Sequence, residues 1–172
     1  MLDQGRAAFR QSIPFRSVNR PGTPGFDPRL QRHHLLPRQV MHRRSFSAMF
    51  TLIGPERLKF DDFRSNGLLL PATDQASLST GMPLHRGPHR RYNEVVTERV
   101  GRIERQWSRA RGYDPESALR TALWQLGLLQ SALRRGLLAE RRKFVLHARD
   151  PIGKDFDFTE LDAMAEALWA KD

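Results

Sequence analysis

The sequence contains no cysteine among its 172 residues, and it has no uninterrupted run of about 18 apolar residues. The absence of cysteine excludes a disulfide framework, a cysteine-ligated zinc finger and a thiol nucleophile. The absence of a long apolar run excludes a membrane-spanning helix. The opening stretch also lacks the hydrophobic segment of a secretory signal, so we expect a chain with no signal peptide and no membrane partner.

Acidic residues are also scarce relative to basic ones, and the excess is uneven. The chain has 29 Lys and Arg against 19 Asp and Glu, a formal net charge of +10, and only 4 of the basic residues are lysine. Residues 1–60 carry a net +8, residues 61–113 carry +3 and residues 114–172 carry −1. Codon bias in a GC-rich genome explains many arginines but not this asymmetry. The first two thirds are therefore expected to bind a polyanion.

The first half of the chain predicts short elements joined by loops. Proline and glycine punctuate residues 1–28, which indicates an irregular basic tail. A strand is expected to end near Pro37, and a short helix is expected over residues 38–50. Asn66-Gly67 is a strong turn signal, and it predicts a turn or hairpin followed by a strand over residues 68–71. Residues 72–84 are small and polar, which favours a loop.

Helices are expected to dominate the second half. Apolar residues at helical spacing predict one helix from Pro88 to about residue 111 and a second that begins at Pro115 after an Asp cap. The second helix is expected to extend as far as residue 142 or to break near Gly127 or Gly136. A last short helix is expected from Thr159. The fold class is therefore α+β, with a predominantly helical C-terminal third.

The histidines form the one group of residues whose pattern suggests a chemical function. His33 and His34 are adjacent, and His85 and His89 are separated by three residues, with Asn66 between the two pairs. Imidazole is the commonest protein ligand for transition metals, and it is the best one available in a chain without cysteine. Together the two pairs predict a metal site.

Adjacent histidines on extended backbone point to opposite sides, which suggests two roles. One can ligate an ion while the other, neutral, accepts a proton from water; metal-assisted hydrolysis needs this division. The side-chain carbonyl of Asn66 is a candidate to orient the base through its second ring nitrogen.

Three segments resemble the AHH branch of the HNH/endonuclease VII superfamily, the His-Me finger or ββα-metal nucleases. They are residues 32–37 (RHHLLP), 66–71 (NGLLLP) and 84–93 (LHRGPHRRYN), in the same order and spacing. The third is the most specific, and the resemblance covers about residues 29–105. One departure is that Arg32 stands where the family has its name-giving alanine.

The resemblance implies a ββα-metal finger core with several packed helices. It implies that His34 is the general base and that Asn66 orients His34 or braces the loop. The implied ligands of a single divalent metal ion are His33, His85 and His89. Ligand type suits Zn, Ni or Mn, whereas Mg prefers oxygen ligands. Arg32, Arg86, Arg90 and Arg91 are expected to contact substrate phosphate.

The expected function is a metal-dependent endonuclease that hydrolyses phosphodiester bonds, with DNA favoured over RNA and little sequence specificity. The alternatives are a ribonuclease of the same fold and a non-catalytic basic nucleic-acid-binding module, with a structural metal or with incidental histidines. The resemblance allows either a cytoplasmic enzyme or a bacterial toxin domain delivered into a target cell, with an acidic immunity protein as partner. The expected division is a tail over 1–28, a nuclease core over 29–111 and a helical extension over 112–172.

Overall fold

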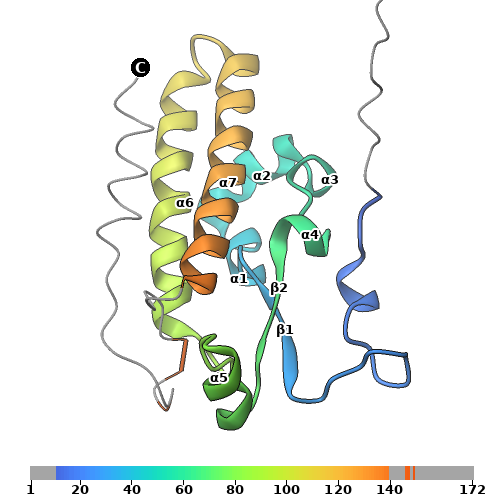
Figure 1. Ribbon diagram of the computed structural model, residues 1–172. Coiled ribbons are helices and arrows are strands. Elements are labelled where there is room, and N and C mark those ends of the chain that lie inside the picture. The colour runs from blue at the N-terminus through green and yellow to red at the C-terminus, as the bar shows by residue number, and fades with distance from the viewer. Residues whose placement is uncertain (1–10, 140–145, 148, 150–172) are drawn as a thin grey trace, which may run out of the picture.

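The computed structural model describes residues 11–139 together with residues 146, 147 and 149. Two long helices, α6 (Arg90–Ala110) and α7 (Pro115–Leu138), lie side by side and run in opposite directions. A small sheet and several short helices pack beside them (Figure 1). The fold is therefore of the α+β class, as the sequence predicts.

The elements that precede the long helices are all short. The two strands are β1 (Leu30–His34) and β2 (Gly67–Pro71). The helical elements are η1 (Phe15–Ser17), α1 (Arg38–Met41), η2 (Arg44–Phe46), α2 (Ser47–Ile53), α3 (Pro55–Leu58), α4 (Phe63–Asn66) and α5 (Asp74–Thr80). The single helix expected over 38–50 is thus three short pieces, and the apolar side chains of that stretch still enter the core.

The two strands pair antiparallel, with His34 opposite Gly67. Residues 35–66 connect them, so the hairpin or turn expected at Asn66-Gly67 is wrong. The Asp62 side chain caps α4 by accepting a hydrogen bond from the backbone N–H of Arg64, and Asn66 ends that helix. Gly67 is extended, and a Cβ there would overlap the Phe63 ring. Close packing, not a turn, therefore requires glycine at this position.

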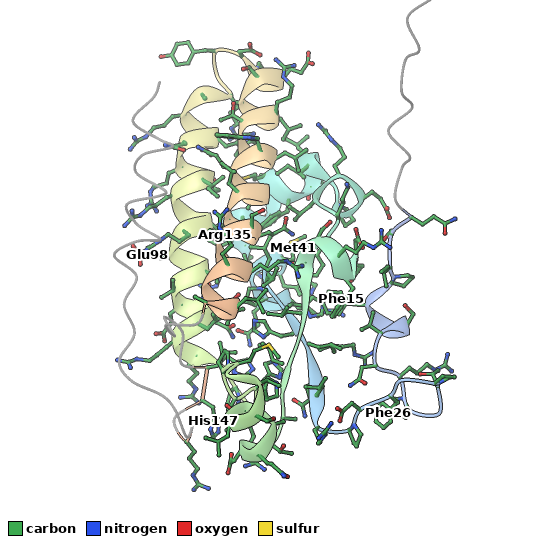
Figure 2. All side chains as sticks on the ribbon, viewed as in Figure 1. Phe15, Phe26, Met41, Glu98, Arg135 and His147 are labelled. Carbon is green, nitrogen blue, oxygen red and sulfur yellow. The ribbon has the colours of Figure 1, made fainter. Side chains whose placement is uncertain are left out.

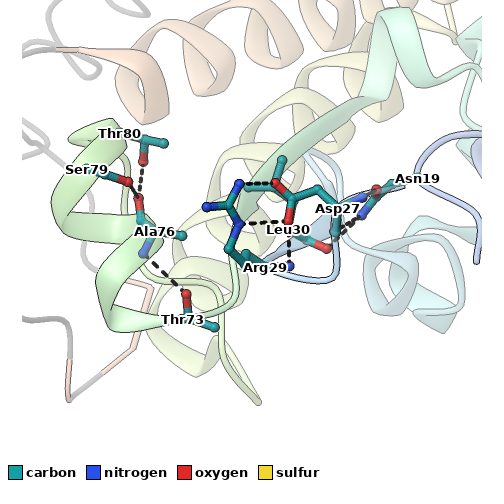
Figure 3. A network of polar contacts seen from close by, with 8 residues as sticks. All are labelled: Asn19, Asp27, Arg29, Leu30, Thr73, Ala76, Ser79 and Thr80. Carbon is teal, nitrogen blue, oxygen red and sulfur yellow. Dashed lines mark hydrogen bonds and ion pairs between the residues drawn. The ribbon is translucent and has the colours of Figure 1, made fainter. Parts of the chain in front are cut away.

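The loop expected over residues 72–84 is wrong for its middle part, which forms α5. The Thr73 side chain accepts a hydrogen bond from the backbone N–H of Ala76 at 3.2 Å, and Gly81 ends the helix in the left-handed conformation. These contacts are shown in part in Figure 3. Serine and threonine are weak helix formers, so composition alone favoured a loop where two caps hold a helix.

Both long helices are confirmed. Asp114 caps α7 by accepting from the backbone N–H of Ser117 at 2.9 Å, and Pro115 occupies the first turn. The helix continues through Gly127 and Gly136 to residue 138. Apolar side chains of α6 and α7 pack with those of α2, α3 and the sheet in one core. The helix expected from residue 159 lies outside the described residues.

The described part of the basic tail is mostly irregular, as expected, but it is attached to the core. Phe15 is 7% exposed, and Pro14 forms an isolated bridge with Asp62. The Asn19 side chain closes the following loop with three hydrogen bonds to the backbones of Asp27 and Leu30 (Figure 3). This segment therefore lies beside the sheet that carries the histidines.

None of the helices formed by residues 11–139 has the length and apolar character needed to cross a lipid bilayer.

Candidate metal centre and active site

The end of β1 separates the two adjacent histidines, as strand alternation requires. His33 is 4% exposed, and its ring lies 4.9 Å from the Tyr92 ring, centroid to centroid. His34 stacks instead on Phe15, with ring centroids 3.6 Å apart and planes within 4° of parallel. The two imidazoles therefore occupy different surroundings although they are neighbours in sequence.

His33, His85 and His89 form the cluster that the sequence predicts. One ring nitrogen from each lies within 4.8 Å of the others. The ring of His33 is 4.9 Å from that of His85 and 5.6 Å from that of His89, and the last two are 4.3 Å apart. Three residues from β1, the loop after α5 and the start of α6 thus converge on one point.

Hydrogen bonds orient two of these rings. His89 Nδ1 lies 3.1 Å from the backbone carbonyl of Leu146, and because a carbonyl only accepts, Nδ1 must carry the proton. His85 Nδ1 lies 3.2 Å from the side-chain oxygen of Gln31, which also accepts. In each ring, Nε2 is therefore the nitrogen whose lone pair is available to a metal. The backbone N–H of His85 donates to the Pro71 carbonyl at 2.6 Å, which holds the loop against β2.

Burial keeps the cluster neutral. Desolvation and the neighbouring imidazoles hold the pKa of His33 well below its ordinary value of 6.5. Burial, with the charge of His89, lowers the pKa of His85 to about 4. Burial also lowers the pKa of His89, although the Leu146 carbonyl opposes this. Neutral imidazole is the form that binds a metal.

The donor set fits a divalent ion. The three imidazoles supply nitrogen ligands suited to Zn, Ni or Mn. Catalytic zinc sites keep three protein ligands and one open position, whereas structural sites are closed by four. Within the described residues, no fourth His, Asp or Glu joins the cluster. The arrangement therefore fits an open site better than a structural one.

The metal-free protein is expected to lose stability in acid. Its buried histidines stay neutral while the unfolded chain protonates below its ordinary pKa of 6.5. The contribution of His85 to the free energy of unfolding is therefore fully present above pH 6.5. It decreases as the pH falls to about 4, where His85 becomes protonated in the folded protein. Protonation of His85 accounts for a loss of unfolding free energy on the order of 2 kcal/mol, after allowance for partial exposure of the side chain.

Urea unfolding in EDTA from pH 7.5 to 4.5 measures this slope. The matched variant is His85→Asn, which should show a shallower decline. An identical slope in both proteins would contradict the assignment of the acid sensitivity to this cluster.

His34 sits in an aromatic pocket. Phe15 covers one face, and the Phe60 ring lies 5.5 Å away at 26°. Burial is the main cause that lowers the His34 pKa to about 4; the charges of Arg38 and Arg32 lower it further and Asp61 opposes them. Its Nε2 is buried with no hydrogen-bond partner among the described residues. Such an unpartnered polar atom costs about 1–3 kcal/mol, so it is a feature that needs a functional explanation.

Asn66 is fully buried and braces the loop that follows His34. Its side-chain oxygen accepts from the backbone N–H of Leu36 at 2.7 Å, and its amide nitrogen donates to the Phe60 carbonyl at 3.1 Å. Its backbone carbonyl accepts from the N–H of Leu35 at 2.8 Å. Of the two roles implied for Asn66, these contacts match the bracing of the loop, and no contact between its side chain and His34 is present in the described region.

The four arginines expected at phosphate differ in their surroundings. Arg32 is committed elsewhere, because its Nη1 donates to the backbone carbonyls of Phe15 at 3.1 Å and Val18 at 3.3 Å. It thereby holds the segment whose phenylalanine stacks on His34. Arg86 is exposed, 4.0 Å from an Asp74 oxygen. Arg90 and Arg91 are exposed at the start of α6, beside His89.

Sequence reasoning missed the residues that support the histidines. Phe15 belongs to a segment interpreted as a tail, and Figure 2 shows its side chain directed toward the core. Gln31 precedes His33 by two residues, so strand alternation places both on one face and was the available signal. Leu146 acts through its backbone carbonyl, which no side-chain pattern reveals.

A model of the AHH family, described as a nuclease family of the HNH/endonuclease VII superfamily with a conserved AHH motif, matches residues 14–120. The match includes all four histidines of the site and also the Phe15 segment. No curated protein and no solved structure shows significant similarity to this chain. Because the family match spans more than half of the sequence, the chain belongs to the AHH family of nucleases.

Proposed function

We propose that this protein is a metal-dependent endonuclease that hydrolyses phosphodiester bonds, with DNA as the favoured substrate. The observation that carries the proposal is the separation of adjacent histidines. His33 joins two other imidazoles in a cluster within 4.8 Å, while His34 stays neutral in an aromatic pocket. Metal-assisted hydrolysis needs both a site for a cation and a separate proton acceptor, and these residues supply them side by side.

His34 is proposed as the general base. Its lowered pKa keeps the ring neutral at pH 7, so a lone pair is available. The ring takes a proton from water as the water oxygen attacks phosphorus, the bond to the leaving oxygen on the opposite side breaks, and that oxygen is protonated from solvent. The Phe15 stack holds the plane of the imidazole in one orientation. Orientation of this kind lowers the entropic part of the barrier.

His33, His85 and His89 are the residues proposed to hold the divalent ion. When bound, the ion supplies a positive charge that stabilises the developing charge on phosphate oxygens. Gln31 and the Leu146 carbonyl fix the tautomers of two of the rings, so Nε2 of each is ready to bind. Zn, Ni and Mn are favoured over Mg because the donors are nitrogen.

Asn66 is proposed as a positioning residue, and Arg86, Arg90 and Arg91 as phosphate contacts. Asn66 acts through the loop after His34 and does not touch the reacting atoms. Arg90 and Arg91 follow a ligand histidine directly, and they have no ion-pair partner within the described residues. Arginine offers two parallel hydrogen bonds to phosphate and stays charged at any working pH.

The chain is proposed to divide into a tail, a nuclease core and a helical extension. Residues 29–111 form the proposed nuclease core and residues 112–172 its helical extension, which is supported by the packing of α7 on α6 and α2–α4. The tail over 1–28 contributes Phe15 to the site. The net charge of +10 suits nucleic acid, and a bacterial toxin role would pair it with an acidic immunity protein.

Cleavage assays test the proposal directly. Plasmid DNA, single-stranded DNA and RNA are incubated with the protein and Zn, Ni, Mn or Mg, with EDTA as the control. We expect cleavage of plasmid with at least one ion and none with EDTA. Cleavage of RNA alone would identify the ribonuclease alternative, and no cleavage of any substrate would refute the enzyme.

Arg32→Ala separates the bracing role of Arg32 from phosphate contact. Because two hydrogen bonds from a charged donor are lost, we expect the free energy of unfolding to fall by about 1–3 kcal/mol, with no change in the salt dependence of DNA binding. Arg90→Ala is the matched control and should do the reverse, reducing the slope of log K against log salt by about 1. A reduced slope with unchanged stability in Arg32→Ala would restore the phosphate contact expected from the sequence.

A further inference from the structure

A second polar surface lies between α3, α4 and α7, and no histidine lines it. Both α3 and α4 pack against α7 beside the sheet (Figure 1). A groove of about 320 Å³ opens between them, and Gly127 and Ser131 of α7 line it. Four of its ten lining residues are cationic and none is acidic: Arg57, Lys59, Arg64 and Arg134.

The charge of this groove is poorly neutralised. Arg57, Lys59 and Arg64 are exposed, and none forms an ion pair within the part of the chain that the structure describes. Burial raises the pKa of the Asp62 carboxyl, but hydrogen bonds and, to a smaller extent, the charge of Lys59 lower it overall. The Asp62 carboxylate is itself occupied, since it accepts from the backbone N–H groups of Ile13 and Arg64. A net positive concave surface therefore faces solvent.

Shape and positioning favour an elongated anion. Arg134 donates to the Arg64 backbone carbonyl, which joins α7 to α4 across the groove. A Cβ added at Gly127 would meet nothing within 4 Å, so the glycine leaves open space in the groove. A surface of this kind fits phosphate oxygens of a polymer better than a compact apolar ligand.

Buried contacts link the groove to the loop that follows His34. Gln130, which lines it, donates to the Asn66 side-chain oxygen at 3.3 Å, and that oxygen also accepts from Leu36, two residues after His34. Lys59 directly precedes Phe60, whose ring lies against His34. Adjacent residues of the chain, Lys59 and Phe60, thus belong to the groove and to the His34 pocket respectively.

We propose that the α3–α4–α7 groove binds the sugar–phosphate backbone of nucleic acid outside the scissile position. The inference rests on the proposed nuclease function. Arg57, Lys59, Arg64 and Arg134 supply contacts that are independent of base sequence. Because Arg134, Gly127 and Ser131 lie beyond residue 120, this part of the surface belongs to the chain outside the family match.

Gly127→Glu and Gly127→Gln form a matched pair that tests the groove. The two side chains have nearly the same size and differ in charge, and helix propensity favours both over glycine in α7. Binding of a fluorescein-labelled DNA duplex is measured by anisotropy in EDTA, so that no cleavage occurs. We expect Gly127→Glu to raise the Kd at least about tenfold at 0.1 M salt and Gly127→Gln to raise it less than about threefold. Equal Kd values for the two variants would overturn the proposal.

A triple variant, Arg57→Gln with Lys59→Gln and Arg64→Gln, tests the cations themselves. The slope of log K against log salt should fall by about 2–3, since each lost phosphate contact removes about 0.9. The control carries the same three charge losses at exposed arginines that do not line the groove: Arg105, Arg109 and Arg135. An equal change of slope in the control would show that the effect comes from net charge, and it would overturn the proposed role of the groove.

Hydrolysis of bis(p-nitrophenyl) phosphate distinguishes failure of this inference from failure of the enzyme. This small diester cannot reach the groove and His34 together, so the triple variant should hydrolyse it at the wild-type rate while it binds DNA weakly. If the triple variant lost diester hydrolysis as well, the proposal that these cations act only in DNA binding would be overturned. If the wild type hydrolyses neither substrate, the proposed nuclease fails, and the anisotropy measurements still decide whether the groove binds DNA.

Discussion

Replacing His34 by alanine is expected to lower the cleavage rate by about 10²–10⁴-fold, the usual contribution of a general base. The protein should still fold, because His34 is only partly buried and its Nε2 makes no hydrogen bond to any residue that the structure describes. It should also still bind metal, because the cluster is built from His33, His85 and His89. Single-turnover cleavage, circular dichroism and metal titration measure the three quantities.

Two controls make the interpretation of His34→Ala specific. The variant removes a ring from between Phe15 and Phe60, and free imidazole added to the buffer can enter that space. We expect imidazole to restore part of the activity, which a purely structural role would not allow. His42→Ala, at an exposed histidine in the same basic region, should cleave at the wild-type rate. Unchanged cleavage by His34→Ala would remove this residue as the base.

A metal site was predictable from the local pattern of the two histidine pairs, and the resemblance to the AHH family implied which three form the cluster. Strand alternation separates His33 from His34, and the glycine–proline break places His89 at the start of a helix. The long helices were predictable for the same reason: apolar spacing and the Asp114 cap are read within one element. In these places local chemistry and tertiary packing favour the same structure.

Other features depended on contacts between distant residues and could not be predicted. Asn66-Gly67 has the sequence of a tight turn, but the Phe63 ring and the Asp62 cap place it at the end of a helix and the start of a strand. The sequence of the Phe15 segment predicts an irregular tail, whereas in the fold the Phe15 ring stacks on His34 and its carbonyl accepts a hydrogen bond from Arg32. Tertiary contacts decided both cases, and single-sequence patterns contain no record of them.

Arg32 combines a local sequence pattern with a tertiary contact that the pattern does not predict. The family has alanine at this position, and the sequence suggested an added phosphate contact. In the fold its guanidinium instead binds two backbone carbonyls of the N-terminal segment. The departure from the family motif is therefore accompanied by an anchored segment that covers the proposed base. A change of residue next to a catalytic histidine can thus act on its surroundings without touching substrate.

His85→Ala is expected to weaken metal binding by more than about 100-fold, beyond the 10–100-fold loss typical of residues that orient a ligand. One of three nitrogen donors is lost, while His33 and His89 remain. Cleavage at limiting metal should fall in proportion. Isothermal titration with Zn, Ni and Mn measures the affinity, and the metal-dependent rise in melting temperature measures it independently, since bound metal stabilises the fold by mass action.

Gln31→Ala is the control that tests the arrangement around this ligand. Gln31 accepts from His85 Nδ1 at 3.2 Å, so its loss should leave all three donors but free one ring to rotate. The affinity should fall by about 10–100-fold, less than in His85→Ala. Because Gln31 touches no other member of the cluster through a hydrogen bond in the described region, a larger loss than that of His85→Ala would contradict this order of roles. If both His85→Ala and Gln31→Ala bound metal with the wild-type affinity, the three imidazoles would not be the site of the ion.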